Sequence, residues 1–163
     1  MSSSSEEDHD LEYQTADSCS EAKESVSCND IRINSYVLIN NRPCRVVELE
    51  HSKPGKHGHA KTNISGTDIF TNKRYTACFP SSHNVFCPII NRQYYELINI
   101  EGNYTTLMAN DGSIREDVML PTNEETRNRI QSVFEETIDT IYKCIVTTLN
   151  WNDESIISEV KRV

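Results

Sequence analysis

The feature that most constrains the fold of this chain is a succession of short apolar runs, each interrupted by polar turn residues. The run Tyr36–Ile39 and the β-branched run Cys44–Leu49 flank the polar turn Asn40–Pro43, so they predict two paired strands. Further extended segments are expected at 59–64, 67–70, 75–79 and 85–87, with Gly66 breaking the chain between the first two. Strands at a spacing of about 8–12 residues predict a small β-barrel or sandwich.

A second series of apolar runs begins after a junction around residues 88–91. Its strands are expected at 93–100, 104–108, 113–120, 141–149 and 155–163. Between the third and the fourth, Thr122 and Glu125 form a capping-box pattern and predict the start of a helix. The apolar residues expected on that helix are Ile130, Val133, Phe134 and Ile141. Three strands, one helix and two more strands are the composition of an OB-fold barrel, so the expected fold class is mainly β.

Charge is distributed unevenly along the chain, which has 25 acidic and 16 basic side chains and a net charge of −9. Residues 1–29 are rich in Ser, Glu and Asp, and this composition predicts a disordered acidic tail. Residues 31–90 carry eight basic and three acidic side chains, a net charge of +5, together with four of the five histidines. The block 91–163 is acidic again. Because salt screens charges beyond about 8–10 Å, the local basic block can still meet a polyanion.

Several protein classes are disfavoured by the sequence. No apolar run approaches the roughly 20 residues that span a bilayer, and the first ten residues lack the basic and apolar regions of a secretory signal. We therefore expect no membrane association and a location in the cytosol or nucleus. The cysteines include no Cys-x-x-Cys pair, so zinc-ribbon and redox motifs are not indicated and free thiols are expected. They lie at positions 19, 28, 44, 78, 87 and 144.

The most unusual segment is Lys53–Lys61, which follows a loop expected to begin at residue 50. It holds three lysines, two histidines and two glycines, with Lys56 between Gly55 and Gly58. Pro54 and Gly55 favour a tight turn, so Lys56 is expected at an exposed tip as a cationic probe. Lys56 is not followed by Ser or Thr, as a phosphate-binding P-loop requires, and an exposed tip is unlike the buried site of a Schiff-base lysine. The residue chemistry alone leaves two hypotheses, a polyanion contact or a basic hairpin tip without a role.

Two other sets of residues were weighed as sites. A metal centre built from the histidines is disfavoured because lysines crowd the loop and no cysteine or acid lies suitably close. The histidines concerned are His51, His57, His59 and His83. Tyr94, Tyr95 and Tyr104 could stack on nucleic-acid bases, although strand aromatics more often form core or cross-strand pairs. No sequence signature of a catalytic triad, a carboxylate pair or a dinucleotide site is recognisable, which leaves catalytic groups brought together only by the fold as an open alternative.

The loop and several later motifs resemble one family. The motifs are Lys53–Lys61, Asp68–Phe70, Lys73–Tyr75, Ser82–Asn84 and Arg115–Asp117. From about residue 30 to the C-terminus the chain is similar to eukaryotic translation initiation factor 5A. The resemblance implies an SH3-like barrel over residues 30–88 that carries the loop, and an OB-fold over residues 89–163.

The resemblance also implies a role for the loop. Lys56 would be converted to hypusine by deoxyhypusine synthase, which transfers the aminobutyl group of spermidine, and by deoxyhypusine hydroxylase. The factor would bind the ribosome beside the peptidyl-tRNA and promote peptide-bond formation at stalled sequences such as proline runs, and termination. The resemblance implies neither an enzymatic activity of the chain itself nor a separate cofactor. The residues expected to contact tRNA or ribosome are Lys53, Gly55, His57, Gly58, His59 and Lys61.

Some positions depart from the family pattern. Pro54 stands where most eukaryotic relatives have Thr, His51 replaces a small hydroxyl residue, and Phe79 looks like an extra residue. Val85–Cys87 and the last forty residues also differ. These departures are typical of a diverged paralogue, and they support an alternative in which the chain is an unmodified RNA- or protein-binding module.

Overall fold

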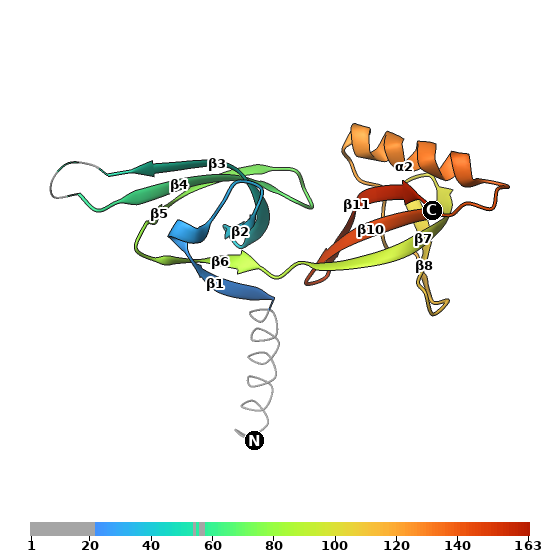
Figure 1. Ribbon diagram of the computed structural model, residues 1–163, viewed down its shortest axis with the longest axis horizontal. Coiled ribbons are helices and arrows are strands. Elements are labelled where there is room, and N and C mark those ends of the chain that lie inside the picture. The colour runs from blue at the N-terminus through green and yellow to red at the C-terminus, as the bar shows by residue number, and fades with distance from the viewer. Residues whose placement is uncertain (1–21, 54, 56–57) are drawn as a thin grey trace, which may run out of the picture. The chain divides into compact units, whose positions relative to one another are not determined.

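Two compact units make up the chain, one ending at Ile89 and the other beginning at Ile90 (Figure 1). The computed structural model describes residues 22–53, 55 and 58–163. The described residues are mostly in strands and contain one α-helix, so the mainly β fold class is confirmed. No helix among these residues is both long and apolar enough to cross a membrane.

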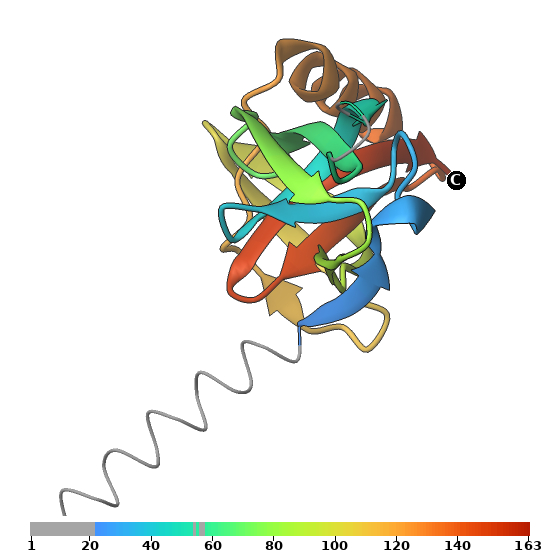
Figure 2. The same ribbon diagram turned by 90° about the vertical axis from the view of Figure 1, so that its left-hand side faces the viewer.

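The first unit consists of antiparallel strands and one short 3-10 helix. Its elements are β1 (Lys23–Ser27), η1 (Cys28–Asp30), β2 (Tyr36–Ile39), β3 (Arg42–Ser52), β4 (Lys61–Asp68), β5 (Arg74–Pro80) and β6 (Asn84–Pro88). One sheet has the order β2-β3-β4-β5, and β1 pairs with β6. Figure 2 views the unit from the end at which β3 and β4 meet the intervening loop, and shows how its strands curl. Val37, Ile39, Val46 and Ile64 are fully buried between them.

The turn between β2 and β3 is shorter than the sequence predicted. Asn40 and Asn41 both adopt positive φ angles, 52° and 60°, as the two central residues of a type I′ turn do. Pro43, which the sequence analysis placed in this turn, lies instead in β3 opposite Leu38. A two-residue turn matches the twist of the flanking strands, so pairing resumes immediately after Asn41.

Gly66 does not break the chain, and the prediction at this position was wrong. The residue lies inside β4, which runs without interruption through it to Asp68 and ends before the predicted end at Phe70. A Cβ built on Gly66 would lie 2.8 Å from Cys44 Cβ and 3.1 Å from the Arg45 carbonyl oxygen. Glycine is therefore required here because β3, which has a register shift between Val46 and Glu48, approaches closely.

The boundary of the acidic tail also needs correction. Residues 23–29, which the sequence analysis assigned to a disordered tail, form β1 and part of η1. Each residue of β1 pairs with one of β6, from Lys23 opposite Pro88 to Ser27 opposite Asn84. Cys28 is fully buried in the core. Pairing with a strand some 60 positions later supplies the order that the local composition does not indicate. Residues 1–21 lie outside the described residues.

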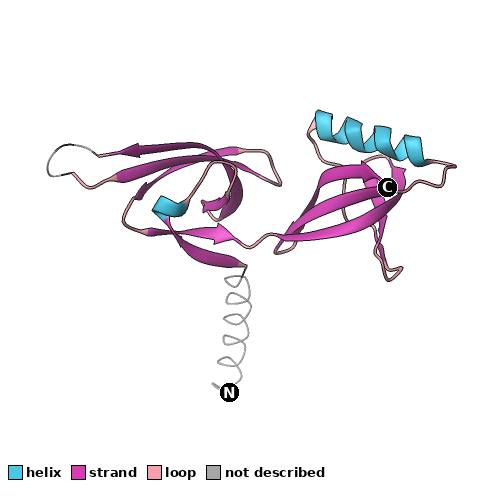
Figure 3. Ribbon diagram, in the orientation of Figure 1, coloured by secondary structure: helices cyan, strands magenta, loops and turns pink. Residues whose placement is uncertain are grey.

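The second unit has five strands and the α-helix, which lies along one side of its sheet (Figure 3). Its elements are β7 (Asn91–Glu101), β8 (Tyr104–Met108), β9 (Ile114–Arg115), α2 (Glu124–Thr137), β10 (Cys144–Trp151) and β11 (Glu154–Arg162). The strand order is β11-β10-β7-β8-β9. Ile130 of α2 is fully buried in the core formed with Leu107, Val146 and Ile157. This burial fixes the helix against β10 and β11.

Both ends of the helix differ from the prediction. The N-cap is Asn123 rather than Thr122, and its side chain accepts a hydrogen bond from the Thr126 backbone N–H at 3.1 Å. Asn caps a helix as well as Thr does, so the start moves by one residue. The helix ends at Thr137, and Ile141, expected on its apolar face, is 91% exposed. Asp139 has a φ of 59°, a backbone conformation that cannot continue the helix.

Most of the segment 113–120, which was predicted to be a strand, does not form a continuous hydrogen-bonded ladder with a neighbouring strand. Within this segment only β9 pairs regularly with β8, and the segment meets β8 again at a single bridge between Tyr104 and Met119. Val118 and Leu120 are buried on either side of the exposed Met119, so the alternating pattern is present. The apolar pattern of the sequence indicates which side chains alternate between the two faces. Whether the segment also forms a hydrogen-bonded ladder depends on the path of the partner strand.

Candidate functional site

The hairpin of β3 and β4 positions the candidate loop. Ser52 and Lys61 are the last paired residues, and the pairs His51–Thr62 and Glu50–Asn63 precede them. The loop therefore comprises residues 53–60. The loop was predicted at 50–58, with extended structure resuming at His59, so its predicted start lies three residues too early and its predicted end two residues too early. Strand pairing across the hairpin, which composition does not report, sets these ends.

The described residues of the loop form an open, cationic end to the hairpin. Lys53, His59 and Lys61 are exposed, and Gly58 is half-buried. Gly55 has a φ of 62°, which glycine adopts readily, and no atom lies within 4 Å of the place of a Cβ. Three sequence-predicted residues, Pro54, Lys56 and His57, lie outside the described residues. Two lysines thus flank the position of Lys56, one on each leg of the loop.

A chain of side-chain hydrogen bonds crosses the base of this loop. The His51 Nδ1 atom lies 3.0 Å from Thr62 Oγ1, which in turn lies 2.8 Å from Ser81 Oγ. Thr62 is fully buried and Ser81 is 8% exposed, while His51 is exposed at the rim. These hydrogen bonds were not predicted from the sequence, in which His51 was considered as a site residue only for a disfavoured metal centre. No sequence signal reports them, because they join residues up to 30 positions apart.

The opposite end of β4 is fixed by a buried ion pair. The Arg42 Nε atom donates to Asp68 Oδ2 at 2.7 Å, and the Asp68 side chain is fully buried. Oδ1 of Asp68 also accepts from the backbone N–H of Phe70 at 2.9 Å and of Thr71 at 3.3 Å. Burial by itself would raise the pKa of Asp68, but these hydrogen bonds outweigh it and hold the pKa below its usual value. Asp68 therefore stays charged and shapes the turn into β5.

The thiols of the described cysteines fall into two groups. Burial raises the pKa of Cys44, Cys87 and Cys144 to about 11, and nearby carboxylates contribute to the rise. Cys28 is also buried, whereas Cys78 on β5 is exposed. All five are free thiols. Among the residues that the structure describes, no three His, Cys, Asp or Glu side chains lie close enough together to hold a metal ion.

The tyrosines proposed as stacking residues do not form one platform. Tyr94 is 62% exposed beside a cavity of about 200 Å³ that Lys143 and Glu96 also line. Tyr104 is 60% exposed beside a different cavity, lined by Glu101 and Glu116. Within the second unit, Tyr94 and Tyr104 therefore line two different cavities.

Tyr95 has a structural role in the same unit. It is half-buried, its hydroxyl donates to Gln93, and the Arg115 guanidinium carbon lies 5.9 Å from its ring centre. Arg115 in turn binds Asp117, with Nε 2.7 Å from Oδ1. The Arg115–Asp117 motif thus forms an ion pair that braces Tyr95.

The chemistry available at the loop is recognition by positive charge. Exposed lysines such as Lys53 and Lys61 act as cations that contact phosphate groups. Neither the environment of these lysines nor that of His59 provides the burial or the charged partner that prepares a nucleophile or a general base. The described part of the loop is therefore suited to bind a polyanion.

Comparisons with known proteins cover most of the chain. Residues 21–83 match the family model described as "Translation initiation factor 5A-like, N-terminal". Residues 89–161 match the family model described as "Eukaryotic elongation factor 5A hypusine, DNA-binding OB fold". The first match contains the whole loop, and the second covers the unit in which the sequence analysis expected an OB-fold.

Individual relatives agree with the family models. The chain is 39% identical over 136 residues to eukaryotic translation initiation factor 5A-2 of Schizosaccharomyces pombe, covering 83% of this chain and 79% of the relative. It is 40% identical over 116 residues to eukaryotic translation initiation factor 5A of Drosophila melanogaster, covering 71% and 73%. A solved structure of a translation initiation factor eif-5a family protein from Naegleria fowleri matches with a TM-score of 0.69 and 36% identity. That match covers 86% of this chain and 99% of the solved chain.

Proposed function

The chain belongs to the eukaryotic translation initiation factor 5A family, a family of translation factors, and on this premise we propose that it promotes peptide-bond formation on the ribosome through hypusine at Lys56. Deoxyhypusine synthase would transfer the aminobutyl group of spermidine to Lys56, and deoxyhypusine hydroxylase would complete the side chain. The protein would then bind beside the peptidyl-tRNA at stalled sequences such as proline runs, and at termination. Its place of action would be the cytosol.

One observation carries this proposal. The β3–β4 hairpin ends in an open loop with exposed lysines on both legs, Lys53 and Lys61, and Lys56 lies between them in the sequence. The family match over residues 21–83 includes this whole segment, and the relatives it represents carry the name of the factor. A loop of this charge and openness supports contact with the phosphates of a tRNA.

The modification suits the chemistry of such a contact. Hypusine would lengthen the side chain of Lys56 and add a second protonated amine. A longer, doubly charged side chain could reach the backbone of the tRNA acceptor end while the protein body stays further away. Holding the acceptor end in a productive geometry lowers the entropic cost of reaction, and such proximity effects are large. The protein would thus act by positioning a substrate on the ribosome.

Mass spectrometry of the protein from its native host tests the modification. We expect the peptide that contains Lys56 to carry the mass of hypusine. Lys56 found unmodified throughout would refute the hypusine mechanism and favour the alternative, an unmodified RNA- or protein-binding module.

A variant tests the mechanism itself. Lys56→Arg keeps the charge but cannot be modified, so we expect it to abolish stimulation of proline-run synthesis in a reconstituted translation assay. Its thermal unfolding midpoint should stay near that of the wild type. Lys73→Arg is the matched control, because Lys73 is an exposed lysine outside the loop and the substitution keeps the charge and leaves Lys56 intact. Equal activity of Lys56→Arg and the wild type would refute the proposed mechanism.

A further inference from the structure

We propose that the hydrogen-bond chain His51–Thr62–Ser81 is a positioning device that sets the direction in which the 53–60 loop leaves the barrel. This inference rests on the proposed function, because its consequence is the presentation of Lys56 to the modifying enzyme and to tRNA. The three residues would not touch the substrate themselves. They would act on Lys56 through the two legs of the loop.

Both legs of the loop are tied to the same residue. The first leg leaves β3 directly after His51 and Ser52, and His51 reaches Ser81 through Thr62. The second leg enters β4 at Lys61, and here the Ser81 backbone N–H donates to the Ala60 carbonyl oxygen at 2.9 Å. Ser81 lies directly after β5, in the turn that leads to β6. One residue of the barrel body therefore holds the two ends of the loop at a common point.

The burial of Thr62 makes this set of hydrogen bonds specific. Thr62 is fully buried, and a buried hydroxyl in a folded protein needs a hydrogen-bond partner. Its Oγ1 has two partners, the imidazole on one side and Ser81 Oγ on the other. The hydrogen bond to Thr62 restricts the side-chain rotamer of His51, two residues before the first leg of the loop begins.

The loop needs such a device because of its composition. Eight residues, two of them glycines, span the distance between Ser52 and Lys61, and each unrestrained residue samples many backbone conformations. When only a fraction of these conformations presents Lys56 correctly, the apparent affinity of a partner falls by that fraction. Anchoring both legs to Ser81 raises the fraction without contact between the anchor and the partner. The expected signature of a broken anchor is therefore a raised KM with an unchanged kcat.

Thr62→Val is the central test, because valine keeps the shape of threonine and removes the hydroxyl. Thr76→Val is the matched control in the same sheet, since Thr76 Oγ1 lies 2.9 Å from Ser65 Oγ in a pair remote from the loop. We measure aminobutyl transfer to the full-length protein by purified deoxyhypusine synthase with spermidine. Thr62→Val should raise the KM for the protein about tenfold at constant kcat, whereas Thr76→Val should leave both constants unchanged. A wild-type KM in Thr62→Val, or the same rise in Thr76→Val, would overturn the inference.

A second pair of variants at His51 separates positioning from packing. His51→Asn can place an amide atom close to the position of Nδ1, so it should keep a KM near that of the wild type. His51→Leu cannot form a hydrogen bond and should behave like Thr62→Val. If the His51→Asn and His51→Leu variants have the same KM, the hydrogen bond of His51 is not the positioning contact and the inference fails at this residue.

Amide hydrogen exchange keeps this inference separable from the proposed function. In Thr62→Val we expect the amides of Lys53, Gly58 and His59 to exchange about tenfold faster than in the wild type, with no change in Thr76→Val. If the synthase does not modify the wild-type protein, the proposed function fails, while the exchange rates still decide whether the chain orders the loop. Unchanged exchange in Thr62→Val would refute the anchoring.

Discussion

Replacing Asp68 by Asn should strongly destabilise the first unit. The Asp68 side chain is fully buried, and it accepts from Arg42 Nε at 2.7 Å and from Arg42 Nη2 at 3.3 Å. Its Oδ1 also accepts from the backbone N–H groups of Phe70 and Thr71. Asn keeps one carbonyl oxygen for the backbone donors but loses the negative charge, so the guanidinium of Arg42 loses its ion pair with Asp68.

The size of the effect follows from burial. Removing one partner of a fully buried ion pair costs about 3–5 kcal/mol, because the other charge stays uncompensated. The Arg42 side chain is 27% exposed, so water can solvate part of its charge. The backbone hydrogen bonds can also survive in the Asn variant. We therefore expect a loss of about 2–3 kcal/mol in the free energy of unfolding, below the range for fully buried pairs.

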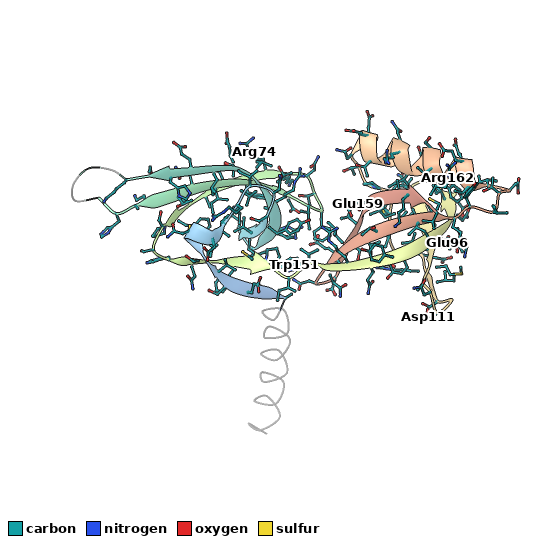
Figure 4. All side chains as sticks on the ribbon, viewed as in Figure 1. Arg74, Glu96, Asp111, Trp151, Glu159 and Arg162 are labelled. Atoms are coloured by element: carbon teal, nitrogen blue, oxygen red, sulfur yellow. The ribbon has the colours of Figure 1, made fainter. Side chains whose placement is uncertain are left out.

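An exposed ion pair of the same length gives the control. Arg74 Nη2 lies 2.7 Å from Glu48 Oε2, but the two side chains are 59% and 71% exposed (Figure 4). Arg74 points outward from β5, where water screens the interaction. Exposed pairs contribute at most about 1 kcal/mol, so Glu48→Gln should have a small effect despite the equal distance. The comparison thus tests whether burial or distance decides the energy.

The assay is urea unfolding at pH 7, followed through amide resonances of residues 36–80 so that the second unit does not contribute to the signal. Because the pKa of Asp68 lies below its usual 3.8 in the folded protein, its stabilisation is complete above that pH and is lost as the pH falls through the folded pKa. The wild type and Asp68→Asn should therefore converge in stability in acid. Equal losses for Asp68→Asn and Glu48→Gln at pH 7 would refute the reasoning, as would a constant difference down to pH 2.

Three further predictions concern packing, reactivity and capping. Gly66→Ala should lower the free energy of unfolding by about 1–3 kcal/mol in the same urea assay, because the new methyl group would lie 2.8 Å from Cys44 Cβ; unchanged stability would contradict that contact. At pH 8, iodoacetamide should label Cys78 rapidly and spare the four buried described thiols until urea is added, as peptide mass spectrometry can show; equal labelling rates would contradict their burial. Asn123→Ala should cost the second unit about 1 kcal/mol, measured by thermal unfolding at 222 nm, whereas Thr122→Ala should cost less; the reverse order would restore Thr122 as the cap.

The local features of this protein were predictable because near neighbours produce them. Alternating apolar residues indicated most strands, and the two asparagines at 40–41 marked a turn. Gly55, which together with Pro54 was expected to favour a tight turn, has a positive φ. A side-chain N-cap of the helix was predicted correctly, but one residue too early, since Thr122 and Asn123 are both good caps.

The predictions failed where a residue's conformation depends on a distant partner. Gly66 looked like a strand break, yet it is the one residue small enough to let β3 approach β4 at that point. The segment 23–27 looked disordered until β6 provided a partner. Ile141 matched the spacing of the helix, but the helix ends at Thr137 and leaves it exposed.

The amino-acid sequence alone determined the mainly β class, the cationic glycine-rich loop and the family to which both belong, because periodicity, charge and motif are properties of consecutive residues. Only the tertiary structure decided where the loop begins and how its base is held. His51, Thr62 and Ser81 are separated along the chain, and strand register brings them within hydrogen-bond distance. Register reflects the burial of many side chains at once, and no short stretch of sequence contains that information.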